Sequence, residues 1–125
     1  MKQITILIIA AAVVMLFLLL KRTGQISAKD AQEHLKQGAL VIDVRSSGEF
    51  RSGHLPQAVN IPLGELETAL PLQVKDKNQM LLLHCQSGMR SAVAVKRLKG
   101  MGYPNVFNLG SFYRASVIVG DAGGK

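Results

Sequence analysis

The sequence predicts an α/β domain with a mostly parallel central sheet flanked by helices, preceded by one N-terminal transmembrane helix. Short apolar runs such as Ala39–Val44 alternate along the chain with segments of helical character, an order typical of parallel sheets. These runs lack polar alternation, as expected when both sheet faces are covered. The only cysteine, Cys85, directly follows the apolar run Met80–His84, and open α/β sheets bind ligands at the carboxyl ends of their strands.

The first 22 residues differ in composition from the rest of the chain. The 17 residues Ile4–Leu20 carry no charge and one polar side chain, Thr5, and cations flank them on both sides. A helix of this length rises roughly 25 Å, and flanking cations can reach the headgroups of a bilayer whose hydrocarbon core is about 30 Å thick. We therefore expect residues 1–22 to be an uncleaved membrane anchor and residues 23–125 the domain. A signal peptide is the alternative, although Lys21-Arg22 replaces the small-residue cleavage site that it needs.

The charges beside this segment predict its orientation. Lys21, Arg22 and Lys29 on the domain side outnumber Lys2 and the α-amino group on the other side, which favours a cytoplasmic domain. A thiol without a partner also persists more readily in a reducing compartment. The sequence thus predicts a single-pass inner (cytoplasmic) membrane protein with its domain in the cytoplasm. A periplasmic or exported domain is the alternative.

The segment before the cysteine is expected to alternate between helices and strands. Thr23–Ile26 reads as a linker or first edge strand, and Ser27–Asp30 resembles a capping box that opens a helix through about Gln37, stopped by Gly38. The next expected elements are the strand Ala39–Val44, a loop with a short helix over Ser46–Gly53, the brief strand Ala58–Asn60, a short helix over Gly64–Leu70 that ends near Pro71, and the strand Met80–His84.

After the cysteine, one helix and one strand are expected. The helix covers Ser91–Lys99, with Ser91 as its cap and Gly100 as its stop. Its expected buried residues are Ala92, Val95 and Leu98. The strand Val106–Leu109 closes the sheet, and the Gly-rich tail Gly120–Lys125 is expected to be frayed.

Length, charge and cysteine count narrow the function classes. Without residues 1–22, 103 of the 125 residues remain, enough for one domain that buries roughly 60 to 70 percent of its unfolded surface. The cluster Lys96, Arg97 and Lys99 is interpreted as a solvated helix face, so no nucleic acid is expected as a partner. One cysteine excludes an internal disulfide, and its spacing from the three histidines, His34, His54 and His84, predicts neither a metal site nor a cofactor.

The loop after the cysteine has the composition of an anion-binding loop. A helix N-terminus and a nearby cation lower the pKa of a thiol from about 8.5, which makes Cys85 a candidate nucleophile. Gly88 suits a sharp turn with positive φ, and the planar fork of Arg90 suits an oxyanion. The alternative is an inert core cysteine at the end of a strand.

Two stretches resemble a single-domain rhodanese, a sulfurtransferase module, and the resemblance extends from about Ile26 to Leu109. Asp43–Pro62 is similar to the family signature of Asp-x-Arg, Glu-Phe, Gly-His-x-Pro-x-Ala and Asn-Ile-Pro, and Cys85–Ser91 resembles its Cys-x-x-Gly-x-Arg-Ser loop. The resemblance implies the rhodanese-like three-layer fold and a persulfide on Cys85. It implies that donor and intermediate are held by the loop residues Gln86, Ser87, Gly88, Met89, Arg90 and Ser91.

The upstream matches imply supporting roles for Asp43, Arg45, Glu49 and His54, with Arg45 and Glu49 paired to each other and Gly53-His54 shaping a turn. The chain departs from the family pattern after Leu109, where the family commonly has Gly-Gly and an aromatic residue, often Trp. Phe112 or Tyr113 is expected to replace that aromatic in packing.

The resemblance implies transfer of a sulfane sulfur through Cys85, from a thiosulfate-like or persulfide donor to a thiol or cyanide acceptor. Gln86 stands where some thiosulfate-using members of the family carry Arg. The sequence does not identify a protein acceptor. A catalytically weak binding module at the membrane is one alternative, although inactive modules usually lack the cysteine. A phosphatase or arsenate reductase is another, but related phosphatases use Cys-x5-Arg, whereas Cys85 and Arg90 are separated by four residues.

Overall fold

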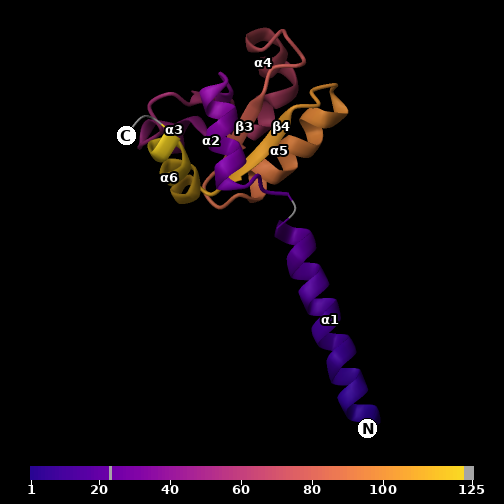
Figure 1. Cartoon of the computed structure of the whole chain (residues 1–125). Coiled ribbons are helices and arrows are strands. Elements are labelled where there is room, and N and C mark those ends of the chain that lie inside the picture. Colours follow the sequence, from indigo (N-terminus) through magenta and orange to yellow (C-terminus); the bar gives the residue numbers. More distant parts are fainter. Residues whose placement is uncertain (23, 123–125) are drawn as a thin grey trace.

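The computed structural model describes residues 1–22 and 24–122, and Figure 1 shows their arrangement. The elements are, in chain order, α1 (Lys2–Arg22), α2 (Ala28–Lys36), β1 (Leu40–Asp43), α3 (Ser47–Arg51), β2 (Val59–Asn60), the 3-10 turn η1 (Leu63–Glu65), α4 (Leu66–Gln73), β3 (Leu81–His84), α5 (Met89–Gly100), β4 (Val106–Gly110) and α6 (Phe112–Ala122). Strands and helices alternate as the sequence predicts.

The described residues form a four-stranded parallel sheet with the order β2-β1-β3-β4. β1 and β3 are aligned from Leu40 opposite Leu81 to Asp43 opposite His84. The carboxyl ends of both inner strands therefore meet at one edge of the sheet, and Cys85 follows directly at that edge. The predicted parallel sheet is confirmed.

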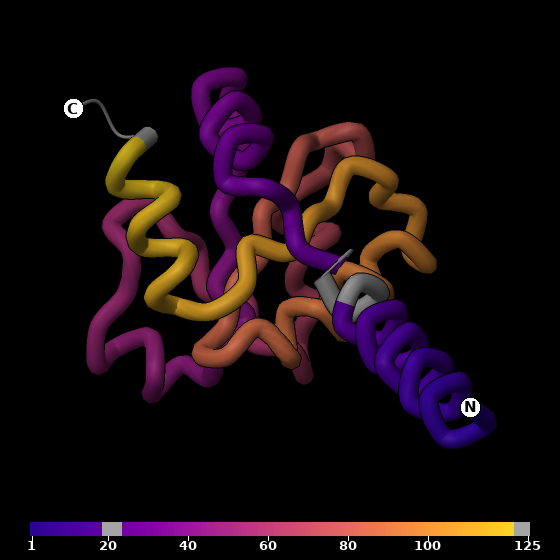
Figure 2. Tube along the Cα trace, turned by 60° about the horizontal axis from the view of Figure 1, so that its bottom comes forward, coloured from indigo at the N-terminus to yellow at the C-terminus, as the bar shows by residue number. Residues whose placement is uncertain are grey.

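Helices cover both faces of the sheet, and each face has its own apolar core. Side chains alternate along a strand, so Val41 and Leu82 face one core whereas Ile42 and Leu83 face the other. The first core lies under α2 and α6, which run side by side in Figures 1 and 2. The second lies under α4 and α5. The covered faces explain why the strands are apolar throughout.

The start and the end of α2 lie where the sequence predicts them, although only the Ser27 half of the expected capping box is present. The Ser27 hydroxyl caps the helix by accepting a hydrogen bond from the Asp30 amide at 3.1 Å. The helix ends at Lys36, and Gly38 follows with φ +96°. Just before it, Gln25 forms an isolated parallel bridge with Asn108, and the expected linker residue Thr23 lies outside the described residues.

The helix expected to end near Pro71 continues past it. Pro71 lies inside α4, which ends at Gln73 after starting from the turn η1. The proline ring removes one backbone donor. Leu66 and Leu70 are nevertheless fully buried, and the Val74 amide donates to the Leu70 carbonyl at 2.8 Å, which keeps the last turn in place.

The expected start of α5 is wrong by two residues. The helix begins at Met89 with Gly88 as its N-cap, so Ser91 lies inside the first turn and does not cap it. Ser91, Ala94 and Leu98 are buried and Val95 packs against the core, whereas Ala92 is exposed, so the expected buried face is correct for Val95 and Leu98 and wrong for Ala92. Ser91 therefore contacts the cysteine and does not cap the helix.

The C-terminal segment expected to be frayed forms α6 as far as Ala122, and residues 123–125 lie outside the described part. Ala115, Ile118 and Val119 are buried at helical spacing in the core beside α2, and this packing outweighs the low helix propensity of glycine. Phe112 packs against the same core and takes the expected aromatic role, whereas Tyr113 is 77% exposed.

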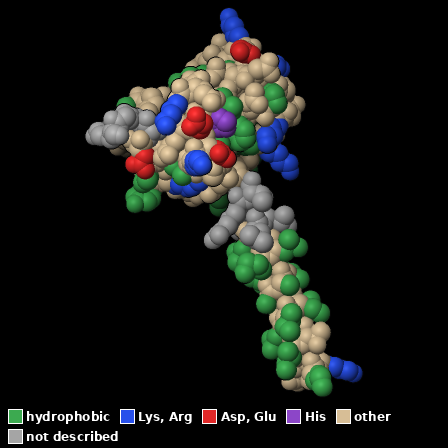
Figure 3. Space-filling view, viewed as in Figure 1, with side chains coloured by type: hydrophobic (Ala, Val, Ile, Leu, Met, Phe, Trp, Pro, Cys, Tyr) green, Lys and Arg blue, Asp and Glu red, His purple; other side chains and the backbone are tan. Residues whose placement is uncertain are grey.

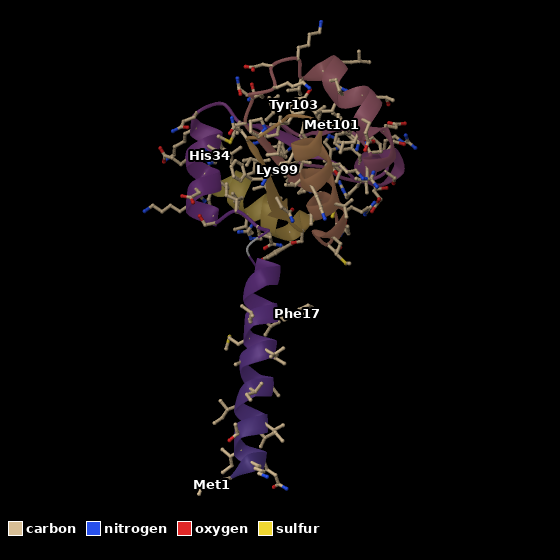
Figure 4. All side chains as sticks on the ribbon, turned by 90° about the vertical axis from the view of Figure 1, so that its right-hand side faces the viewer. Met1, Phe17, His34, Lys99, Met101 and Tyr103 are labelled. Atoms are coloured by element: carbon tan, nitrogen blue, oxygen red, sulfur yellow. The ribbon has the colours of Figure 1, made fainter. Side chains whose placement is uncertain are left out.

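α1 projects away from the domain, and hydrophobic side chains cover it in Figure 3. They point outward from Met1 to Phe17 in Figure 4, and Ile4 and Leu18 are 63% and 51% exposed. In the part of the chain that the structure describes, no helix combines the length and the apolar character needed to cross a membrane. The expected helix is confirmed, but the expected transmembrane span is not supported.

Candidate active site

The loop 85–91 is fixed to the neighbouring β4–α6 turn by backbone hydrogen bonds. The Cys85 amide donates to the Gly110 carbonyl at 3.3 Å, and the Gln86 carbonyl accepts from the Phe112 amide at 3.2 Å. Ser87 and Ser111 form an antiparallel bridge in the same region. The sheet edge and this turn together give the loop a defined shape before any ligand arrives.

The Cys85 thiol lies at the centre of the loop and is fully buried. Its Sγ accepts a hydrogen bond from the Gly88 amide at 3.0 Å, and the Ser91 hydroxyl lies 3.6 Å away. Gly88 has φ +98°, and a Cβ there would come within 3.3 Å of the backbone of Gly110. Only glycine therefore fits the position that aims this amide at the sulfur.

The balance of burial and hydrogen bonding favours the thiolate of Cys85. Burial alone raises the pKa of the thiol, because it penalises the charged form. Hydrogen bonds from the amide and hydroxyl of Ser91, and then from the amides of Gly88 and Ser87, act in the opposite direction and prevail. The pKa of Cys85 is therefore lowered from its ordinary value, as the sequence predicts for an activated thiol.

A buried asparagine that sequence reasoning missed organises this loop. Asn108 lies in β4; its Oδ1 accepts from the Ser91 hydroxyl at 2.7 Å and from the Gly110 amide at 2.8 Å. Its Nδ2 donates to the Gly88 carbonyl at 3.2 Å. The signal in the sequence is a lone polar residue in the apolar run Val106–Leu109, which buries a side chain that needs partners.

Arg90 forms a bidentate ion pair with Glu49 at the rim of the loop. Its Nη1 and Nη2 donate to Oε1 and Oε2 of Glu49 at 2.7 and 2.9 Å. Glu49 also completes a capping box with Ser46 at the start of α3. The bonds from Arg90 and then from Ser46 lower the pKa of Glu49 to about 2. The pKa of Arg90 is raised, mainly by Glu49 and to a lesser extent by Cys85.

The expected pairing of Arg45 with Glu49 is therefore wrong. Arg45 is buried, and its guanidinium binds the carboxylate of Asp43, with the shortest bond at 2.7 Å. It also donates to the Gly53 carbonyl at 2.7 Å and contacts the Gln86 amide oxygen at 3.4 Å. Asp43 and Glu49 are both within a few residues of Arg45 in sequence, but Glu49 is bound by Arg90 and Ser46 instead.

His84, which is not among the expected site residues, and His54, which is, differ in their surroundings. His84 is buried at the end of β3; its Nδ1 lies 3.2 Å from the Cys85 carbonyl, and its Nε2 lies 3.7 Å from Oδ2 of Asp43. Burial lowers the pKa of His84 despite the opposing charge of Asp43. His54 is exposed and stacks on Phe50, so it shapes the turn after α3.

The structure thus brings most of the predicted residues together around one sulfur. Asp43 and Arg45 lie behind the loop, Glu49 and Arg90 at its rim, and the Met89 side chain is 76% exposed beside them. No group of three or more His, Cys, Asp or Glu side chains within residues 1–22 and 24–122 is placed to hold a metal ion. A groove of about 510 Å³ between residues 24–27 and α5 does not include the loop 85–91.

Comparison with known proteins gives one consistent result. The family model described as Rhodanese-like domain matches residues 27–115. Over 69 residues the chain is 38% identical to thiosulfate sulfurtransferase PspE of Escherichia coli (strain K12). The aligned region covers 55% of this chain and 66% of that protein. Over 88 residues it is 33% identical to the thiosulfate:glutathione sulfurtransferase of Homo sapiens, covering 61% of this chain and 76% of that protein.

A solved structure agrees with these relatives. The human single-domain sulfurtransferase TSTD1 superimposes with a TM-score of 0.64 at 28% identity, covering 75% of this chain and 95% of that chain. The likeness in sequence and in fold supports a sulfurtransferase.

Proposed function

The chain belongs to the rhodanese-like domain family, and on that premise we propose that Cys85 carries a sulfane sulfur as a persulfide between a donor and an acceptor. The observation that carries the proposal is the 3.0 Å hydrogen bond from the Gly88 amide to Sγ, at a thiol whose pKa is lowered. The lowered pKa increases the fraction of Cys85 that is thiolate, and the thiolate is the nucleophilic form.

The first step forms one S–S bond and breaks another. The thiolate of Cys85 attacks the outer sulfur of thiosulfate, an S–S bond forms at Sγ, and the electron pair of the donor S–S bond leaves with sulfite. The enzyme then bears a persulfide anion, and the total charge is unchanged. In the second step cyanide or a thiolate attacks the outer sulfur of the persulfide, which yields thiocyanate or a new persulfide and restores the thiolate.

The loop has the donors that this intermediate needs. The amides of Gly88 and Ser91 and the Ser91 hydroxyl already stabilise negative charge on Sγ. In the persulfide the charge moves one atom outward, toward the mouth of the loop, where Arg90 lies. We therefore assign Cys85 as the catalytic residue and the loop residues from Gln86 to Ser91 as the donor-binding set.

Intact-mass spectrometry of the purified chain tests the proposal. Incubation with thiosulfate should add about 32 Da, one sulfur atom, and reductant should remove it. Cys85→Ser should gain no mass and lose turnover from thiosulfate to cyanide while it keeps the native thermal midpoint, because serine is nearly the same size but forms no persulfide. A native chain that gains no sulfur would identify a binding module instead. The cytoplasmic location of the domain stays a prediction.

A further inference from the structure

The cations beside the candidate site are already engaged with acidic partners or carbonyls. Arg45 is buried against Asp43, so its charge is compensated inside the domain. Arg90 gives two hydrogen bonds to Glu49, and both partners are partly open to solvent, with side chains 39% and 35% exposed. Gln86, next to the cysteine, carries no charge. A ligand that approaches Cys85 therefore meets an ion pair and not an isolated cation.

The guanidinium of Arg90 interacts with both Glu49 and Cys85. Glu49 is its bidentate partner, and the Cys85 thiolate also contributes to raising the pKa of Arg90. A dianionic ligand gains attraction from Arg90 and meets repulsion from the Glu49 carboxylate at nearly the same place. A monoanion of similar shape receives half of that attraction and half of that repulsion, so the contribution of the Glu49 carboxylate by itself disfavours the dianion more than the monoanion.

We propose that Glu49 is a specificity-determining residue that selects the charge of the ligand reaching Cys85, and that it favours monoanionic over dianionic sulfur donors. The preference among sulfur donors rests on the proposed function, whereas the selection by ligand charge does not depend on it. Because Glu49 is held as a carboxylate by Arg90 and by the Ser46 amide and hydroxyl, the selection is built into the rim of the loop.

The substitution Glu49→Gln isolates the charge. Glutamine can still complete the capping box with Ser46 and accept one hydrogen bond from Arg90 through its Oε1, whereas the bond from Nη2 of Arg90 to Oε2 is lost because the amide nitrogen is a donor. The matched control is Glu67→Gln, which removes the same charge from an exposed pair with Arg97 at 3.8 Å, on helices outside the loop. Both variants should keep a cooperative thermal unfolding transition, which shows that they stay folded.

The first experiment needs no sulfur transfer. Iodoacetate and iodoacetamide alkylate the same thiol and differ by one negative charge. In Glu49→Gln the ratio of their second-order rate constants with Cys85 should shift toward iodoacetate by about three- to tenfold at low salt. The shift should shrink as ionic strength rises, since exposed charges are screened. Glu67→Gln should keep the native ratio, and an unchanged ratio in Glu49→Gln would overturn the inference.

The second experiment uses thiosulfate, a dianion, and methanethiosulfonate, a monoanion with a methyl group in place of one oxygen. In each case the Cys85 thiolate takes the outer sulfur, and the electron pair leaves with sulfite or methanesulfinate. In Glu49→Gln the ratio of kcat/KM for thiosulfate to that for methanethiosulfonate should rise about three- to tenfold. A parallel fall for both donors would show that Glu49 only supports Arg90. An altered alkylation ratio without any sulfur transfer by the native chain would refute the proposed function alone.

Discussion

At the scale of single residues, the site depends on how one hydroxyl proton is shared. Ser91 has three acceptors within reach: Oδ1 of Asn108 at 2.7 Å, the Gly88 carbonyl at 3.1 Å and Sγ of Cys85 at 3.6 Å. A hydroxyl donates one hydrogen, so the nearest acceptor, Asn108, competes with the sulfur. When Cys85 is a thiolate, the hydrogen bond from the Ser91 hydroxyl to its sulfur is stronger, because hydrogen bonds to ionised acceptors are stronger.

The change Ser91→Ala should therefore raise the pKa of Cys85. Removing the hydroxyl leaves the amides of Ser91, Gly88 and Ser87 as donors, and burial then opposes the thiolate more effectively. The pH midpoint of alkylation by iodoacetamide should move upward, and kcat/KM below that midpoint should fall about two- to tenfold, the size of a hydrogen bond of about 0.5–1.5 kcal/mol. An unmoved midpoint would show that the hydroxyl serves Asn108 alone.

At the scale of elements, the inner strands β1 and β3 both end in a buried polar residue, and Asp43 and His84 lie opposite each other in register. Nε2 of His84 has no hydrogen-bond partner among the described residues. Burial lowers the pKa of His84, so the folded chain keeps a neutral imidazole where the unfolded chain binds a proton. This contribution to stability is present above the ordinary pKa of about 6.5 and is lost as the pH falls.

The free energy of unfolding should therefore fall less between about pH 7 and about pH 5 in His84→Gln than in the native chain. Glutamine can donate to the Cys85 carbonyl as Nδ1 does, but it binds no proton in this range. Denaturant titrations at several pH values measure the effect, and equal slopes in the two chains would contradict the assignment.

Sequence patterns could predict the strands and the cysteine loop, because burial on both faces and the strand-loop-helix order depend on nearby residues. They could not predict contacts chosen by the packed fold. The carboxylate of Glu49 reaches Arg90, 41 positions away, and not its sequence neighbour Arg45. Asn108 likewise meets Ser91 only after β4 is aligned beside β3. Pro71 is a local signal for a helix end, but burial of Leu66 and Leu70 prevails over it.

At the scale of the whole molecule, the domain has its own apolar cores, and the described residues of α1 are not part of them. Both apolar cores draw on residues between Ile26 and Val119, and no described residue of α1 belongs to them. The chain next to α1 is, by contrast, part of the site. The Ile26 amide donates to the Asn108 carbonyl at 3.0 Å, and the Gln25 side chain lies so close to Gly110 that a Cβ there would meet it at 2.9 Å.

The boundary of the working domain should therefore fall between α1 and Gln25. A chain that lacks residues 1–22 should keep its thermal midpoint within about 2 °C and its kcat/KM for thiosulfate within about twofold, because it retains every core residue. A chain that lacks residues 1–26 loses the contacts of Gln25 and Ile26 with β4 and the carbonyl that Arg114 binds, so both quantities should fall. Calorimetry and turnover of the two truncations measure the difference. Equal losses in both would mean that α1 itself supports the site.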